Sequence, residues 1–183
     1  MSFPGIPSLD AAVMAFIQTH FHNTVTDTVF PIITSLGEAG IGWIVLSLVL
    51  LCFKKTRRTG GLVLIAMTVT LLFGELTLKN IICRLRPCNV FTDFPMLIAR
   101  PTSYSFPSGH TSSSFAAALI LTLRHKKIGW LAYIPAVLIA FSRIFLFVHY
   151  PTDVLAGILL GTLAALLTYF AAKAIQKRQA EKR

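Results

Sequence analysis

The chain has 183 residues, of which 55% are hydrophobic and only 13% are charged. This composition is too apolar for an ordinary soluble domain and indicates an integral membrane protein built as a single domain over residues 1–183. The formal net charge of +10 does not indicate nucleic-acid binding, because the basic residues lie at the ends of apolar blocks and do not interleave with aromatic residues.

The apolar blocks predict an all-α fold, a polytopic bundle of about six membrane helices. Residues 9–22 have helical spacing with polar interruptions, which favours an interfacial helix, and residues 24–36 predict a second short helix that contains Pro31. Whether residues 1–36 cross the membrane stays open. Later helices are predicted at 40–53, 60–83, 111–123, 128–148 and 154–172. Four prolines within residues 84–107 predict an ordered loop.

The basic residues divide unequally between the two ends of the predicted spans. Of the 17 Lys and Arg residues, four lie at 54–58, three at 124–127 and five at 173–183, all on one side. The positive-inside rule places these 12 residues, and with them the C-terminus, in the cytoplasm. We therefore expect a multi-pass protein of a bacterial cell membrane, with the loop at 84–107 on the extracytoplasmic face.

The first candidate site residues are Lys79 and Arg86, which are seven positions apart. On a continuous helix this spacing would stack both cations on one face, with Arg84 on another, and such a pair can hold a phosphate. The alternative is that both side chains extend to lipid headgroups. Glu75 lies one turn before Lys79 and either offsets the cost of burying cations or contributes to substrate choice.

The second candidate is the run Pro107-Ser108-Gly109-His110, which ends the loop where a helix is predicted to begin. Backbone N–H groups and the positive end of a helix dipole favour an anion at such a position. Gly109 permits close approach of the backbone, and Ser108 adds a hydroxyl donor. The alternative is a plain helix N-cap at Ser108 with an incidental histidine.

The third candidate is His149 with Asp153, four residues apart across Pro151. Because Pro suits the first turn of a helix, the carboxylate can reach back to the imidazole, fix its tautomer and leave the other ring nitrogen as a nucleophile. Arg143 precedes this pair and can bind phosphate oxygens through its fork of donors. Taken singly, a histidine at the end of a span is more often an interfacial side chain, and it is the combination that favours a site.

Taken together, the three segments resemble the complete signature of a known family. They read Lys79-x6-Arg86-Pro87, Pro107-Ser108-Gly109-His110 and Ser142-Arg143-x5-His149-x3-Asp153. This pattern resembles that of the type 2 phosphatidic acid phosphatases, a family that also includes vanadium haloperoxidases. The resemblance covers residues 79–153 directly, and outside them only the hydropathy agrees.

The resemblance implies a lipid-phosphate phosphatase that works through a phosphohistidine. His149 would attack phosphorus, Asp153 would orient His149, and His110 would protonate the leaving group. The phosphate-binding residues would be Lys79, Arg86, Ser108, Gly109 and Arg143. The sequence shows no typical set of metal ligands, so we expect metal-independent catalysis without a cofactor.

The substrate is expected to be a phosphorylated lipid, which membrane lipids would surround. The resemblance favours undecaprenyl diphosphate. Phosphatidic acid and phosphatidylglycerol phosphate are alternatives, because the motifs bind phosphate and every candidate carries a phosphate group. A lipid phosphotransferase on the same scaffold is a further alternative, whereas sparse polar residues within the spans argue against a transporter or channel. The oligomeric state and a disulfide between Cys83 and Cys88 stay open.

Overall fold

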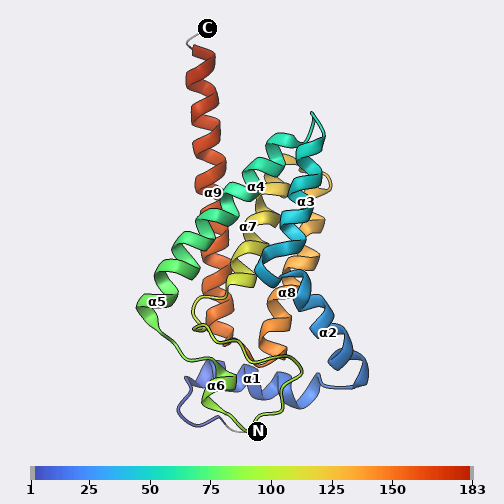
Figure 1. The fold of residues 1–183 in the computed structure, drawn as a ribbon, viewed down its shortest axis with the longest axis vertical. Coiled ribbons are helices and arrows are strands. Elements are labelled where there is room, and N and C mark those ends of the chain that lie inside the picture. Colours follow the sequence, from blue (N-terminus) through green and yellow to red (C-terminus); the bar gives the residue numbers. More distant parts are fainter. Residues whose placement is uncertain (1–2, 182–183) are drawn as a thin grey trace.

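A computed structural model describes residues 3–181, and these residues form helices and connecting segments without any strand (Figure 1). The predicted all-α fold is therefore confirmed. The elements are α1 (Ser8–His20), α2 (Thr24–Leu36), η1 (Glu38–Gly40), α3 (Ile41–Cys52), α4 (Arg57–Thr70), η2 (Leu71–Leu78), α5 (Lys79–Ile82), α6 (Pro87–Val90), α7 (Gly109–Arg124), η3 (Gly129–Ala132), α8 (Tyr133–Phe145) and α9 (Pro151–Glu181).

Within residues 3–181, two segments are long and apolar enough to cross a membrane, Arg57–Val90 and Pro151–Glu181. Helix α2 and the segment Glu38–Cys52 together would form a third span, bent by 45° at the break between them. The segment Gly129–Phe145 is a shorter apolar helix. Helix α1 lies across one end of the bundle in Figure 1 and is not among these span candidates. This position agrees with the interfacial helix predicted for residues 9–22.

Helix α1 is attached to the bundle by polar contacts at both of its ends. The Gln18 amide nitrogen donates to the backbone oxygens of Ile144 and Phe145, at 3.3 and 3.0 Å. Near the other end of α1, the carboxylate of Asp10 is fully buried. The opposite face of this helix exposes apolar side chains such as Leu9 and Phe16. Helix α1 therefore has one face in the protein and one apolar face outside it.

The crossing of α7 and α9 forms the centre of the bundle and is made by small residues. A Cβ added to Gly157 would lie 2.7 Å from the backbone oxygen of Ser108, and one added to Gly161 would lie 2.3 Å from that of Ser112. Two glycines four residues apart allow helix backbones to approach closely. Because α7 begins at Gly109 and α9 at Pro151, this crossing fixes two segments of the predicted site relative to each other.

The predicted helix over residues 60–83 ends close to the expected residue, but its last part is not a regular α-helix. Residues Leu71–Leu78 form a π-helix, a conformation that often accompanies functional sites. Cys83 then adopts a left-handed backbone conformation with φ of 51°, and residues 83–86 leave the helix. The prediction that Lys79 and Arg86 stack on one continuous helix is therefore wrong. Cys83 and Cys88 are both free thiols.

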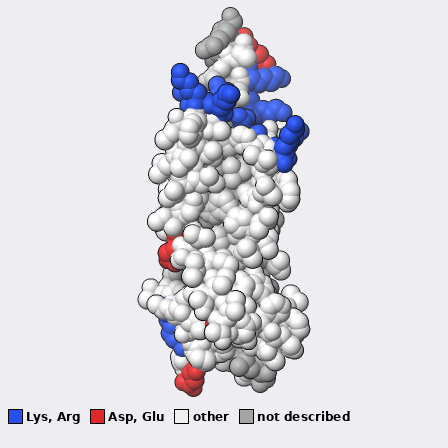
Figure 2. All heavy atoms as spheres, turned by 90° about the vertical axis from the view of Figure 1, so that its right-hand side faces the viewer, with Lys and Arg blue, Asp and Glu red and all other residues white. Residues whose placement is uncertain are grey.

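Some Lys and Arg side chains lie toward the end with loop 84–107, but most gather at the end of the molecule that carries the C-terminal part of α9 (Figure 2). They belong to the connection from α3 to α4, the connection from α7 to η3, and the last turns of α9. Loop 84–107 and α1 lie at the opposite end (Figure 1). Ten of the 12 basic residues that the sequence places on one side thus lie at one end of the bundle, and the other two, Lys182 and Arg183, lie outside the described residues.

The α7–α9 crossing generates a stability prediction for Gly161→Ala. The added methyl group meets backbone atoms that cannot rotate away, so we expect a loss of about 1–3 kcal/mol, the usual cost of overpacking. The midpoint of thermal unfolding in detergent should fall by about 2–4 °C for each kcal/mol.

Gly61→Ala is the matched control, because a Cβ on Gly61 of α4 meets nothing within 4 Å. This variant should be neutral or slightly more stable, since alanine reduces the freedom of the unfolded chain. Equal thermal midpoints for the two variants would contradict a tight crossing at Gly161.

Candidate functional site

The three predicted segments meet at the end of the bundle near α1, around one cavity of about 920 Å³. Six of the eight predicted site residues line this cavity: Lys79, Arg86, Gly109, His110, Arg143 and His149. The other two, Ser108 and Asp153, are fully buried behind it. The structure therefore brings together groups that lie up to 74 positions apart in the sequence.

His149 lies in the short connection between α8 and α9 and is only 1% exposed. Its Nε2 atom is 2.9 Å from Nη1 of Arg86, and its Nδ1 atom is 3.4 Å from Oδ2 of Asp153. A guanidinium group can only donate, so Nε2 must accept and the ring proton belongs on Nδ1, facing the carboxylate. This tautomer leaves the Nε2 lone pair, the one a nucleophile needs, on the side of the cationic cavity.

The surroundings of His149 also favour its neutral form. Burial is the main cause that lowers the pKa of His149 well below its ordinary value, and the positive charges of Arg86 and Arg143 lower it further. A neutral imidazole is the form that can attack phosphorus. The nucleophilic form is thus present across the neutral pH range.

Asp153 is the third residue of α9 and has no solvent exposure. Its Oδ2 atom accepts a hydrogen bond from the backbone N–H of Tyr150 at 2.9 Å and another from the Ser105 hydroxyl at 2.5 Å. The Ser105 hydroxyl also lies 3.4 Å from Nδ1 of His149. The predicted approach of Asp153 to His149 across Pro151 is therefore present, and Ser105 supports it from the preceding loop.

Two buried arginines bring positive charge to the cavity from different elements. Arg86 donates to the backbone oxygens of Val148 and Ser103, at 2.9 and 2.7 Å, which holds its guanidinium against His149. Arg143, at the end of α8, donates from Nη1 to the hydroxyl of Thr34 at 2.5 Å. Its Nε atom is buried without a hydrogen-bond partner among the described residues. An unpaired buried donor of this kind is ready to bind an anion.

Lys79 is paired with Glu75, whose two carboxylate oxygens both lie 2.7 Å from the ammonium nitrogen. This contact is the charge-offsetting role proposed above for Glu75. A Cβ added to Gly109 would lie only 2.1 Å from Oε1 of Glu75. The carboxylate therefore rests against the first residue of α7, the kind of position that favours an anion. A bound phosphate would compete with Glu75 for the same donors.

Ser108 and His110 occupy the two sides of the α7 N-terminus. The Ser108 hydroxyl caps the helix by accepting from the backbone N–H of Thr111 at 3.4 Å, so the plain N-cap interpretation describes its side chain here. Its backbone N–H donates to the backbone oxygen of Asp153 at 3.1 Å, which joins α7 to α9. His110 points to the cavity, and its Nε2 atom lies 3.6 Å from a carboxylate oxygen of Glu38.

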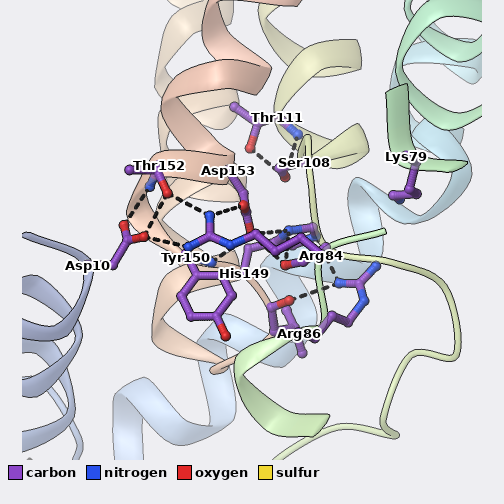
Figure 3. Close-up of polar contacts among 12 residues, drawn as sticks. Asp10, Lys79, Arg84, Arg86, Ser108, Thr111, His149, Tyr150, Thr152 and Asp153 are labelled. Carbon is purple, nitrogen blue, oxygen red and sulfur yellow. Dashed lines mark hydrogen bonds and ion pairs between the residues drawn. The ribbon is translucent and has the colours of Figure 1, made fainter. Parts of the chain in front are cut away.

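Sequence reasoning missed several residues that hold the site. Arg84 contacts Asp153 and Asp10, although its position was assigned to another helix face (Figure 3). Thr34 holds Arg143, and Arg100 donates to backbone oxygens of residues 88, 92 and 94 within its own loop. Of these residues, Asp10 could have been singled out from the sequence, because it is the acidic residue of a mostly apolar helix and acidic residues are seldom buried without a partner.

The cavity is not polar throughout. Away from the cations it continues between the bent pair α2 and α3 on one side and α4 on the other, where apolar side chains line it. These side chains are Pro31, Ile44, Leu64, Met67 and Leu71. The arrangement can therefore receive a ligand with an anionic head and an apolar tail.

Comparisons with known proteins agree with this description. A family model described as the PAP2 superfamily matches residues 59–177. The chain is 39% identical to the undecaprenyl-diphosphatase of Sulfolobus acidocaldarius over 127 residues, which cover 69% of this chain and 61% of that protein. It is 31% identical to the undecaprenyl-diphosphatase BcrC of Bacillus subtilis, over 81% of this chain and 76% of that protein.

A solved structure is also similar in fold. The crystal structure of a transmembrane PAP2 type phosphatidylglycerolphosphate phosphatase from Bacillus subtilis superposes with a TM-score of 0.74 and 29% identity. The superposition covers 94% of this chain and 89% of the other. Both chains thus have the same helical arrangement over nearly their whole lengths.

The cationic cavity predicts binding of vanadate, an anion that can adopt the trigonal bipyramidal shape of a phosphoryl-transfer transition state. At about 100 times its Kd, vanadate should stabilise the purified protein by about 2.7 kcal/mol, measured as a rise in the thermal midpoint. Arg143→Gln removes the unpaired Nε donor and should weaken vanadate binding at least about tenfold, or about 1.4 kcal/mol.

Arg124→Gln is the matched control, because Arg124 ends α7 far from the cavity. It should bind vanadate like the wild type. An unchanged response of Arg143→Gln to vanadate would show that this arginine does not face the anion site.

Proposed function

This chain belongs to the PAP2 superfamily, and from that membership and the cavity around His149 we propose that it is a membrane lipid phosphatase acting through a phosphohistidine. The helices long enough to cross a membrane, and a similar structure that is transmembrane, indicate an integral membrane protein. The catalytic domain proposed is the whole chain, residues 1–183, because helices outside the matched segment also line the cavity.

One observation carries the proposal: the unprotonated Nε2 atom of His149 faces a cavity lined by Lys79, Arg86 and Arg143. Phosphoryl transfer needs little covalent chemistry from a protein beyond a positioned nucleophile and positive charge around the phosphate oxygens. The three cations can supply this charge, so the proposed reaction needs no metal ion or other cofactor.

The proposed first step is an in-line attack of His149 Nε2 on phosphorus. The N–P bond forms as the P–O bond to the leaving group breaks, and His110, which takes up a proton once the anionic phosphate lies beside it, gives that proton to the leaving oxygen. Arg86, which contacts Nε2 in the empty site, moves its donor to a phosphate oxygen as the substrate enters. The imidazole becomes positively charged, and Asp153 stabilises it through Nδ1.

In the second step a water molecule attacks the phosphohistidine and releases inorganic phosphate. After donating its proton, His110 is neutral and can accept a proton from this water. The N–P bond breaks, and His149 returns to its neutral state. His110 lies on the cavity wall with a free ring nitrogen among the described residues, as both steps require.

Undecaprenyl diphosphate is the substrate that we propose. The cavity joins a cationic floor to an apolar wall between α2, α3 and α4, so it suits a phosphate group on a long apolar chain. A diphosphate carries more negative charge than a monoester, and three cations match that charge better. Two relatives bear the name undecaprenyl-diphosphatase. Phosphatidic acid and phosphatidylglycerol phosphate share the same head and are the alternative substrates.

We further propose that the site faces the extracytoplasmic side of a bacterial cell membrane, with the C-terminus in the cytoplasm. The gathering of basic residues at the opposite end of the bundle supports this orientation (Figure 2). A lipid phosphate anchored in the outer leaflet could then enter the cavity without leaving the membrane.

The activity is tested by phosphate release from purified protein in detergent with excess EDTA. We expect turnover of undecaprenyl diphosphate to exceed that of phosphatidic acid and phosphatidylglycerol phosphate, and glycerol 3-phosphate to react at least about tenfold more slowly, because it has no apolar tail for the wall of the cavity. His149→Ala should form neither product nor phosphoenzyme.

Three outcomes would each contradict part of the proposal. Loss of activity on chelation with recovery on adding Mg²⁺ would contradict metal independence. Transfer of the phosphoryl group to another lipid, with no free phosphate, would identify a phosphotransferase. Turnover by His149→Ala would contradict the assignment of the nucleophile.

The orientation is tested by single cysteines in a variant whose three native cysteines, Cys52, Cys83 and Cys88, are replaced by serine. Thr102→Cys lies in the exposed part of loop 84–107 and should react with a membrane-impermeant thiol reagent in intact cells. Gln176→Cys, exposed near the end of α9, should react only after the membrane is permeabilised. The reverse labelling pattern would overturn the proposed orientation.

A further inference from the structure

A buried charge network connects helix α1 to the site through Asp10 (Figure 3). Oδ2 of Asp10 lies 2.7 Å from Nη2 of Arg84 and 2.7 Å from the hydroxyl of Thr152. Oδ1 of Asp10 accepts from the backbone N–H of Thr152 at 2.9 Å. Asp10 therefore caps the first turn of α9 from a different helix and also binds the arginine.

Arg84 joins the two carboxylates. Its Nη1 atom donates to Oδ1 of Asp153 at 2.6 Å and to the hydroxyl of Thr152 at 2.7 Å (Figure 3). The flat side of its guanidinium group covers the ring of Tyr150, at 3.7 Å from the ring centroid. Arg84 does not line the cavity and has its donors engaged by protein groups, so it is not placed to bind phosphate.

The two oxygens of Asp153 thus have different partners. Oδ1 receives Arg84, whereas Oδ2 receives Ser105 and the backbone of Tyr150 and faces Nδ1 of His149. A carboxylate held at one oxygen by a fixed guanidinium cannot rotate freely. The contact on Oδ1 therefore sets the direction in which Oδ2 meets the imidazole.

We propose that Arg84, held by Asp10, is a positioning residue that keeps the Asp153 carboxylate directed at His149. This proposal rests on the phosphohistidine mechanism proposed above. Arg84 touches neither the substrate nor the reacting atoms and acts through Asp153. Helix α1 takes part in catalysis because it supplies the carboxylate that holds Arg84.

The charges around Asp153 make the effect of Arg84 measurable. Arg84 is the cation in direct contact with it, His149 and Tyr150 face it from the connection before α9, and Ser105 faces it from the loop before α7. Asp10 faces it from α1 through Arg84, and Arg86 reaches it through His149. Removal of Arg84 should leave Oδ1 of Asp153 without its fixed donor, so the carboxylate can turn away from Nδ1 of His149.

The first test compares kcat and KM for Arg84→Gln, Arg84→Lys and the wild type. In Arg84→Gln, kcat should fall about tenfold or more, the scale typical of lost supporting contacts, with KM changed by less than about threefold. Arg84→Lys keeps the charge but loses the fork of donors, so it should recover only part of kcat.

Asp10→Asn tests the other end of the network. It removes the charge that holds Nη2 of Arg84, so kcat should fall because Arg84 is held less firmly, with KM changed by less than about threefold. Asp27→Asn is the matched control, since Asp27 of α2 pairs with His22 and lies outside the network. It should leave kcat and KM unchanged.

Vanadate titrations of the same variants provide a readout that needs no turnover. Vanadate can bond to the imidazole, so Arg84→Gln should bind it more weakly than the wild type. If the wild type binds vanadate but releases no phosphate from any lipid, the proposed function fails and these titrations still test Arg84. Wild-type kcat and vanadate affinity in folded Arg84→Gln would overturn the proposal. If that variant does not fold, wild-type values of both quantities in Arg84→Lys and in Asp10→Asn would overturn it.

Discussion

The buried carboxylate of Asp153 is the constraint on which the organisation of the site depends. A charge without solvent exposure is stable only when both of its oxygens have donors. Arg84 satisfies one oxygen, and Ser105 together with the backbone of Tyr150 satisfies the other. Segments from separate parts of the chain are therefore tied to one side chain. The Oδ2 atom that these contacts fix in place also faces Nδ1 of the His149 imidazole.

The positive charges that line the cavity, in contrast to the charge of Asp153, are only partly compensated by protein groups. Lys79 has Glu75, but Arg86 shares its donor with a neutral histidine, and Arg143 keeps a buried nitrogen without a partner among the described residues. Like charges held together in a poorly solvated place raise the free energy of the empty site. An anionic substrate relieves this repulsion, so the same groups that cost stability contribute binding. Glu75 partly fills that role until the substrate arrives.

Much of the fold and site was predictable because the relevant patterns are local. Helical spacing gave α2 its bounds, and Pro151 marked the first turn of α9. The network around Arg84 was not predictable in the same way. Its position was judged on a continuous helix, whereas the chain leaves the helix at Cys83 in a left-handed conformation that a non-glycine residue rarely adopts. Asp10 meets Thr152 across 142 positions, and no local pattern encodes such a contact.

Two supports of the site come from the N-terminal helices α1 and α2. The family match at 59–177 includes every predicted site residue, but it includes neither Asp10 nor Thr34. Asp10 of α1 holds Arg84, and Thr34 of α2 holds Arg143. Helix α2 also contributes to the wall of the cavity. The matched segment therefore carries the proposed reacting groups, while the helices before it contact two arginines and line the apolar part of the cavity. Changes in these helices can alter rate and substrate choice without any change in the motifs.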